Sequence, residues 1–94
     1  MAARIEVEHA GPNQFRVRVI ENQTQTSHLV TAKQADCERI AAGKIEPAEL
    51  VKHSFEFLLE NEPKESILAR FDLSVIARYF PAFEGEMKRR LAAL

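Results

Sequence analysis

Tryptophan is absent from this chain, cysteine and tyrosine occur once each, and glycine occurs only three times. The single cysteine, Cys37, cannot form an internal disulfide, which favours a reducing compartment. No stretch approaches the roughly 20 apolar residues that a membrane-spanning helix needs, and the N-terminus lacks the apolar run of a signal peptide. We therefore expect a cytoplasmic protein without a membrane segment.

Neither sign of charge is in excess. Thirteen Lys and Arg residues face 14 Asp and Glu residues, so the formal net charge is −1. Proteins that bind nucleic acid usually carry a basic excess. With 94 residues, of which 46% are hydrophobic and 29% charged, the composition is typical of one globular domain. The sequence therefore predicts a single domain over residues 1–94 for which nucleic acid is not the expected partner.

The first third of the chain alternates apolar and polar residues, which is the period of strands. Turn residues at 11–13 separate two such runs. A short loop there places apolar residues together on one face and opposite charges together on the other. The predicted pairs are Ile5 with Val19, Val7 with Val17, His9 with Phe15, Glu6 with Arg18 and Glu8 with Arg16. A third strand is predicted at about residues 26–30, with its facing left open.

From about residue 32 the hydrophobic period changes to about 3.6, which predicts helices. Thr31 and Gln34 fit a capping box for a helix over residues 32–42. A proline followed two residues later by glutamate predicts helix starts at Pro47 and Pro63, and Pro81 with Glu84 is a looser copy. The other predicted helical segments are 47–61, 67–71, 73–80 with Asp72 as its cap, and 81–94.

These patterns predict an α+β domain. A three-stranded antiparallel meander over about residues 4–31 packs on a C-terminal array of four to five helices over about residues 32–94. The helix at 47–61 has an apolar arc of roughly 200°, so we expect it to lie between the sheet and the later helices. The last helix should lie across the outside on a narrow stripe of Phe83, Met87, Leu91 and Leu94. The predicted core consists of Ile5, Val17, Val19, Leu50, Phe55, Leu58, Ile67, Leu68, Ile76 and Phe80.

The stretch from residue 54 to residue 81 carries a distinctive pattern. It contains Ser-Phe-Glu-Phe-Leu-Leu-Glu, Glu62-Pro63, Ser66-Ile67-Leu68, Phe71-Asp72-Leu73-Ser74-Val75-Ile76 and Tyr79-Phe80-Pro81. It resembles a group of short uncharacterised bacterial proteins that have no assigned function, and the resemblance covers most of the chain. The resemblance implies a bacterial source and a stand-alone domain. It supplies no activity, cofactor or catalytic residue.

One side of the predicted helix 47–61 carries residues that can ligate metal in other proteins. They are Glu49, His53, Glu56 and Glu60. Their H-x-x-E order reverses the E-x-x-H motif of di-iron helices, and no second helix of this kind completes a site. We expect this strip to be a solvated helix face and the domain to fold without metal or cofactor.

The sequence contains no clear catalytic motif. Cys37 lies at helical spacing with Ile40 and Ala41, which predicts a small buried residue rather than a reactive thiol. A nucleophile elbow, a Gly-rich phosphate loop and a paired cysteine motif are all absent from the sequence. We therefore predict no catalytic residue.

Two basic clusters keep a nucleic-acid role open. Arg4, Arg16 and Arg18 lie on the outer face of the predicted sheet, and some small folds hold single-stranded RNA on such a face. The last helix carries the second cluster, which consists of Lys88, Arg89 and Arg90. A helix-turn-helix over residues 67–94 is disfavoured because its middle helix is mostly apolar.

The favoured hypothesis is a small non-enzymatic cytosolic binding or regulatory module that acts through protein contacts. The alternative is a nucleic-acid-binding regulator that uses the outer sheet face or the C-terminal helix, and an enzyme comes third. We expect a protein partner, no membrane, and a monomer or weak homodimer. An edge of the sheet could add a partner strand.

Overall fold

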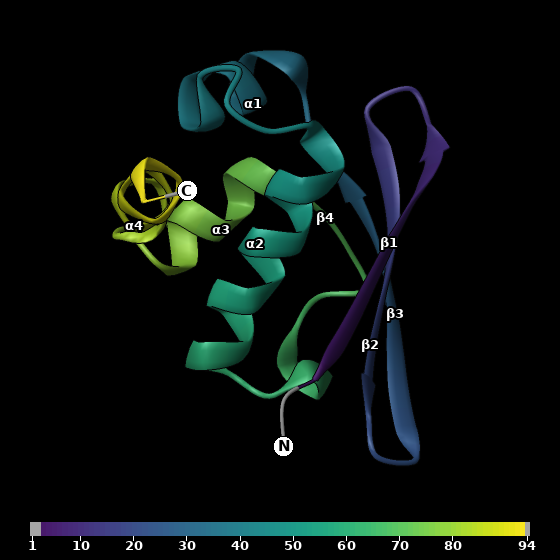
Figure 1. The fold of residues 1–94 in the computed structure, drawn as a ribbon. Helices are drawn as coiled ribbons and strands as arrows, with labels where there is room; N and C mark the ends of the chain where they lie inside the picture. Colours follow the sequence, from purple (N-terminus) through teal and green to yellow (C-terminus); the bar gives the residue numbers. More distant parts are fainter. Residues whose placement is uncertain (1–2, 94) are drawn as a thin grey trace.

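The computed structural model describes residues 3–93, and its N-terminal third is a sheet of long strands (Figure 1). Strands β1 (Arg4–Gly11), β2 (Gln14–Glu21) and β3 (Thr24–Thr31) form an antiparallel meander. Every predicted pair of the first hairpin is in register, from Ile5 opposite Val19 to His9 opposite Phe15. On β3, His28 and Val30 are buried, so these two residues share the apolar face with Phe15 and Val17.

A fourth strand corrects the predicted three-stranded sheet. Strand β4 (Arg70–Asp72) pairs in parallel with β3, so the sheet is mixed and its order is β1-β2-β3-β4. Much of this strand lies in the segment 67–71, which we predicted to be helical. A three-residue strand is too short to show a period of its own, and its conformation is set by pairing with β3 about 40 residues earlier in the chain.

Four α-helices and one short 3₁₀ helix make up the rest of the chain. They are α1 (Gln34–Ala41), α2 (Pro47–Asn61), η1 (Lys64–Ser66), α3 (Leu73–Tyr79) and α4 (Phe83–Ala92). Two predicted starts are confirmed, because Pro47 opens α2 and the Asp72 side chain accepts a 2.9 Å hydrogen bond from the Ser74 N–H. The start predicted at Pro63 opens only the three-residue η1.

Two predicted helix starts are wrong. The capping box of Thr31 does not form, because Thr31 still belongs to β3 and Lys33 stands at the N-cap of α1. Pro81 lies outside α4, whose N-cap is Ala82. The helix-turn-helix over residues 67–94, which the sequence disfavours, does not form, because residues 67–69 are not helical and residues 70–72 form β4.

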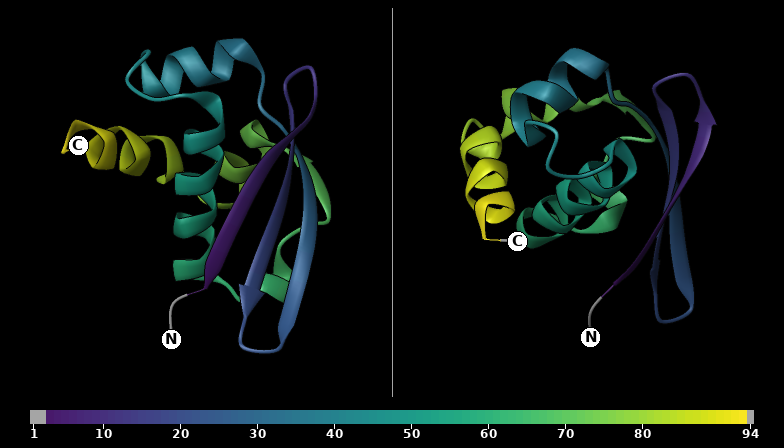
Figure 2. Two further views of the ribbon diagram at one scale, coloured as in Figure 1. Left: turned by 45° about the vertical axis from the view of Figure 1, so that its right-hand side comes forward. Right: turned by 45° about the horizontal axis from the view of Figure 1, so that its top comes forward.

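The helices all cover one face of the sheet, which leaves the other face open (Figure 1). Helix α2 lies next to the sheet, and α4 lies on the far side of α2 in both views of Figure 2. The predicted places of the central and outer helices are therefore confirmed. Within residues 3–93, no helix is both long enough and apolar enough to cross a membrane.

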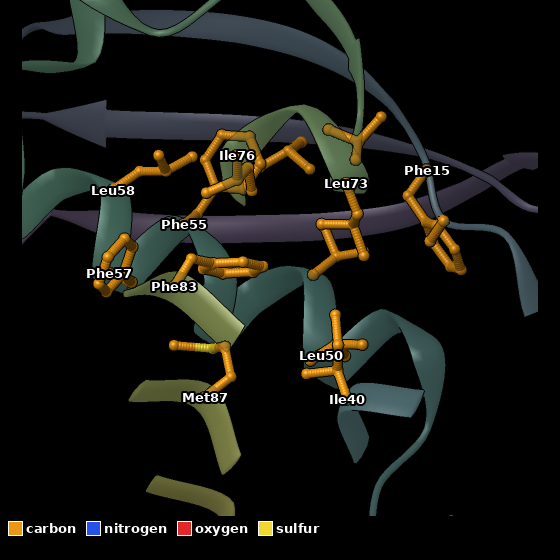
Figure 3. Packing of buried hydrophobic residues seen from close by; sticks show 14 of the residues in the cluster. Phe15, Ile40, Leu50, Phe55, Phe57, Leu58, Leu73, Ile76, Phe83 and Met87 are labelled. Atoms are coloured by element: carbon orange, nitrogen blue, oxygen red, sulfur yellow. The ribbon is translucent and has the colours of Figure 1, made fainter. Parts of the chain in front are cut away.

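The core is continuous from the sheet through α2 to α4 (Figure 3). Phe55 is fully buried, and its ring centroid lies 5.3 Å from that of His28 and 5.9 Å from that of Phe71. The predicted core residues that are buried are Val17, Val19, Leu50, Phe55, Leu58, Ile67 and Ile76. Ile5 and Phe80 are half-buried at the margin of this core.

Leu68 was predicted to lie in the core, but it is 48% exposed. Ile67, beside it, is buried and has an extended backbone with φ −76° and ψ 132°. Successive side chains of an extended segment point to opposite sides. Burying Ile67 therefore turns Leu68 outward.

Helix α4 is attached by an apolar stripe and by two arginines. Phe83, Met87 and Leu91 are buried as predicted, and Leu94 lies outside the described residues. Arg39 of α1 donates to both carboxylate oxygens of Glu84, at 3.1 and 2.8 Å. The Arg90 guanidinium lies 5.7 Å from the centroid of the Phe57 ring on α2. The outermost helix is thus fixed to both α1 and α2.

Replacing Phe55 by alanine tests the central place of α2. We expect Phe55→Ala to lower the free energy of unfolding by about 3–5 kcal/mol, because it removes a fully buried ring and leaves a cavity. Urea melts of the variant and the wild type measure this. Tyr79→Ala is the matched control, since Tyr79 is 68% exposed, and should cost less than about 1 kcal/mol. A loss below about 1 kcal/mol for Phe55→Ala contradicts the assignment.

The Arg39–Glu84 ion pair predicts a pH-dependent term in stability. The hydrogen bond from Arg39 lowers the pKa of Glu84. A lowered folded-state pKa gives stability that is present above the ordinary carboxyl pKa and is lost as pH falls through the lowered value.

Glu84→Gln should therefore cost up to about 1 kcal/mol at neutral pH. The difference between variant and wild type should shrink as the pH falls through the lowered pKa of Glu84, because the wild-type carboxylate then becomes protonated. Urea melts at a series of pH values from neutral downwards measure this difference. Glu38→Gln is the control, since the described part of the chain holds no ion pair for the exposed Glu38. A Glu84→Gln difference that stays constant with pH contradicts the prediction.

Candidate functional site

A hollow on the surface lies where α2, η1, β4 and α3 meet, and we call it the apolar groove. Its volume is about 300 Å³, which is at the small end of the range for ligand sites. It is lined by Leu58, Glu62, Ser66, Ile67, Leu68, Phe71, Val75, Ile76, Tyr79 and Phe80. Most of these side chains are apolar, so the groove offers contact area rather than a set of reacting groups.

Helices α2 and α3 form two borders of the groove. Leu58 lies near the end of α2, and Glu62, whose backbone is extended, is the residue at the C-cap of this helix. Val75 and Tyr79 lie four residues apart on α3 and therefore share one helix face. Ile76 contributes from the buried side of α3.

The third border is the segment 66–71, which is fixed to the sheet by a buried histidine. His28 is 3% exposed, and its Nδ1 lies 2.7 Å from the Leu68 carbonyl oxygen. A carbonyl only accepts, so Nδ1 carries a hydrogen and donates it, while Nε2 lies 2.8 Å from the Thr26 hydroxyl oxygen. The Leu29 N–H also donates to the Ala69 carbonyl at 2.8 Å. This border is therefore held in place from within the molecule.

Both strongly exposed large hydrophobic residues of the described chain line this groove. Leu68 is 48% exposed and Tyr79 is 68% exposed. Single exposed apolar residues are common, but their gathering around one hollow is a feature of contact surfaces. The sequence pattern did not reveal this site, because the predicted core included Leu68. The alternation of Ile67 and Leu68 around a short strand was the signal that could have revealed it.

The polar part of the groove is acidic. Glu62 and Ser66 line it, and Glu62 forms no ion pair within residues 3–93. Glu65, in contrast, is held by Lys64, whose hydrogen bond lowers the pKa of Glu65. Helix α2 has no basic residue in its last turn to offset the negative end of the helix dipole. The groove therefore combines apolar borders with an uncompensated negative charge.

The strip on α2 makes one contact within the helix and one ion pair with α4. His53 Nδ1 lies 3.0 Å from a Glu56 carboxylate oxygen, and Glu60 accepts from Arg90 at 2.6 Å. Over the described chain, no three His, Cys, Asp or Glu residues are grouped so that they could hold a metal ion. Glu56 and Glu60 instead border an open hollow between β1 and α2 that also contains Arg4 and Lys52. Its mixed charges favour no particular ligand.

The arginines predicted on the outer sheet face are partly neutralised. Arg4 and Arg18 both pair with Glu6. Arg16 stands opposite Glu8 in register, but the ion pairs found in residues 3–93 do not include it. Arg70 of β4 adds an exposed arginine to this face, which was not predicted because β4 is not evident in the sequence.

The basic residues of the last helix are mostly paired as well. Arg89 pairs with Glu86, and Arg90 pairs with both Glu86 and Glu60. Lys88 is exposed. Helix α4 lies on the side of the molecule away from the sheet, so this cluster does not join the arginines of the outer sheet face (Figure 2). Neither cluster forms a continuous basic track.

Cys37 lies on the buried face of α1, as its spacing predicts. Burial raises the pKa of its thiol, and the neighbouring Asp36 carboxylate raises it further. A thiol with a raised pKa stays protonated at neutral pH and is a poor nucleophile. Cys37 therefore acts as a small residue in the core.

We expect no useful binding to nucleic acid at physiological salt, because affinity for phosphates requires several cations along one track. Fluorescence anisotropy with mixed-sequence single-stranded RNA and duplex DNA at about 150 mM salt measures this. Binding at or below about 1 μM that is weakened by Arg16→Glu or Arg89→Glu contradicts this prediction.

Comparisons with known protein families, with curated proteins and with solved structures found no match to this chain. Fold likeness therefore supplies no function. The chemistry of the surface has to carry any functional conclusion, and the apolar groove is the surface with the most specific chemistry.

Proposed function

We propose that this protein is a non-enzymatic binding or regulatory module that acts through protein contacts, and that the apolar groove is its contact surface. The observation that carries this proposal is the position of Leu68 and Tyr79. These are the two large hydrophobic residues left strongly exposed over residues 3–93, and both line the same groove. Contact surfaces concentrate exposed apolar area in this way, with aromatic residues as anchors.

The occupant is a short protein segment with an apolar side chain and a basic residue beside it. The apolar side chain of the segment would pack on Leu58, Val75 and Ile76. Its basic residue would pair with Glu62, which is the one charged residue in the lining. A basic residue there also meets the negative end of α2. Charge thus orients the segment, and apolar burial supplies most of its affinity.

The lining also bears on the class of activity. Its polar side chains are Glu62, Ser66 and Tyr79, without a histidine or cysteine among them. Nucleophilic catalysis by a serine requires a neighbouring base that is itself oriented by a third group. The groove supports binding better than turnover. The proposal also includes a cytosolic location in a bacterial cell, in keeping with the lone buried Cys37 and the resemblance described above.

A phage-displayed library of random short peptides tests the proposal. Selection on the wild-type chain should enrich peptides in which an apolar residue lies near Lys or Arg. Leu68→Asp should weaken binding of the selected peptides at least about tenfold, measured by anisotropy of the labelled peptides, because it puts a charge on the border of the groove.

Ala92→Asp is the matched control, because it adds the same charge at an exposed position on α4 and should leave the affinity unchanged. Melting curves of both variants verify the fold. Two outcomes contradict the proposal: no peptide enriched above background, or selected peptides that bind Leu68→Asp as well as the wild type.

A further inference from the structure

A second copy of this chain presents the chemistry that the apolar groove accepts. Tyr79 is 68% exposed, and the residue before it, Arg78, is exposed too. Arg78 forms no ion pair within the described residues. The end of α3 therefore offers an aromatic side chain next to a free basic residue. This is the pairing of an apolar anchor and a cation that the groove and Glu62 match.

The groove and the anchor lie on one patch of the surface. Tyr79 is itself a lining residue of the groove, together with Leu58 and Glu62. Such a patch carries a projection, a hollow and the unpaired Glu62 carboxylate, and the exposed Arg78, which is not itself a lining residue, precedes Tyr79 on α3. A two-fold interface uses the same patch on both subunits, so it requires a surface that is complementary to itself.

We infer that the protein forms a weak two-fold homodimer through the apolar groove, an inference that rests on the proposed function. Each Tyr79 covers the groove of the other copy, and each Arg78 pairs with the partner's Glu62. The two-fold axis repeats this ion pair, so Arg78 and Glu62, which form no ion pair within one chain's described residues, are each paired in the dimer. Leu68 is covered in the same contact.

The strength of this dimer follows from its size. The groove is small, with a volume of about 300 Å³, so we expect the contact to bury less than the roughly 800 Å² that a standard interface buries on each partner. We therefore expect a dissociation constant in the micromolar range or weaker, with monomer dominant in dilute solution. Occupation of the groove by a second copy also excludes other segments, so self-association and partner binding compete for one surface.

Sedimentation equilibrium from about 5 to about 500 μM tests the inference. The wild type should shift from monomer towards dimer over this range. Tyr79→Ala, Glu62→Arg and Arg78→Glu should each weaken association at least about tenfold. The double variant Glu62→Arg/Arg78→Glu should restore association to within about threefold of the wild type, because the exchanged charges pair again across the axis.

Arg16→Glu is the matched control for Arg78→Glu, since it makes the same charge change at an exposed residue on the outer sheet face. It should leave association unchanged. Melting curves of every variant establish that the fold is retained.

Three results overturn the inference: a wild type that stays monomeric throughout, a double variant that associates no better than the single variants, or an Arg16→Glu variant as weakened as Arg78→Glu.

The proposed function is tested separately, by the binding of the selected peptides. If the chain stays monomeric while these peptides bind it and lose affinity to Leu68→Asp, the homodimer fails and the proposed function stands. If the chain dimerises through Tyr79 and no peptide is enriched, the groove is a self-association surface alone.

Discussion

The pairing of the segment 67–72 with β3 is the contact on which the second half of the molecule depends. It joins residues about 40 positions apart, and His28 stands at its centre with hydrogen bonds to the Leu68 carbonyl and the Thr26 hydroxyl. Because both ring nitrogens have hydrogen-bond partners, burial of this imidazole does not incur the free-energy penalty of an unpaired buried polar group. The same ring packs on Phe55 of α2. One side chain thus connects the sheet, the central helix and the segment that leads into β4.

This pairing sets the position of everything that follows it. Helix α3 begins directly after β4, and Asp72 is both the last residue of the strand and the cap of that helix. Helix α4 then turns back over α2 and is fixed to α1 through Arg39 and Glu84. The apolar groove is the hollow left between α2, the pinned segment and α3. Because its borders are fixed by core contacts, an occupant would meet a surface that is already ordered, which lowers the entropic cost of binding.

The parts that could be predicted from the sequence are those where two independent signals agree. In the first hairpin, the apolar pairing and the charge pairing favour the same register, and a slip of one residue loses both. Helix α2 combines an apolar arc with Pro47 at its start. The failures lie where local chemistry competes with distant contacts. Thr31 has the chemistry of a helix cap but is held in β3, and β4 is too short to show a period.

The error at Leu68 has the same origin and leads to the candidate site. A helical reading of residues 67–71 allows Ile67 and Leu68 to share a buried side, whereas the extended backbone imposed by β3 separates them. The buried bond from His28 to the Leu68 carbonyl fixes that backbone and leaves the leucine side chain in solvent. The exposure of Leu68 is therefore a consequence of how the core is tied together. Tyr79, the last residue of the short helix α3, is exposed as well, while Leu73 and Ile76 are the residues of α3 that are buried. The constraints that complete the core thus also place an apolar border around the groove, and its one uncompensated charge, Glu62, gives that surface a preference among partners.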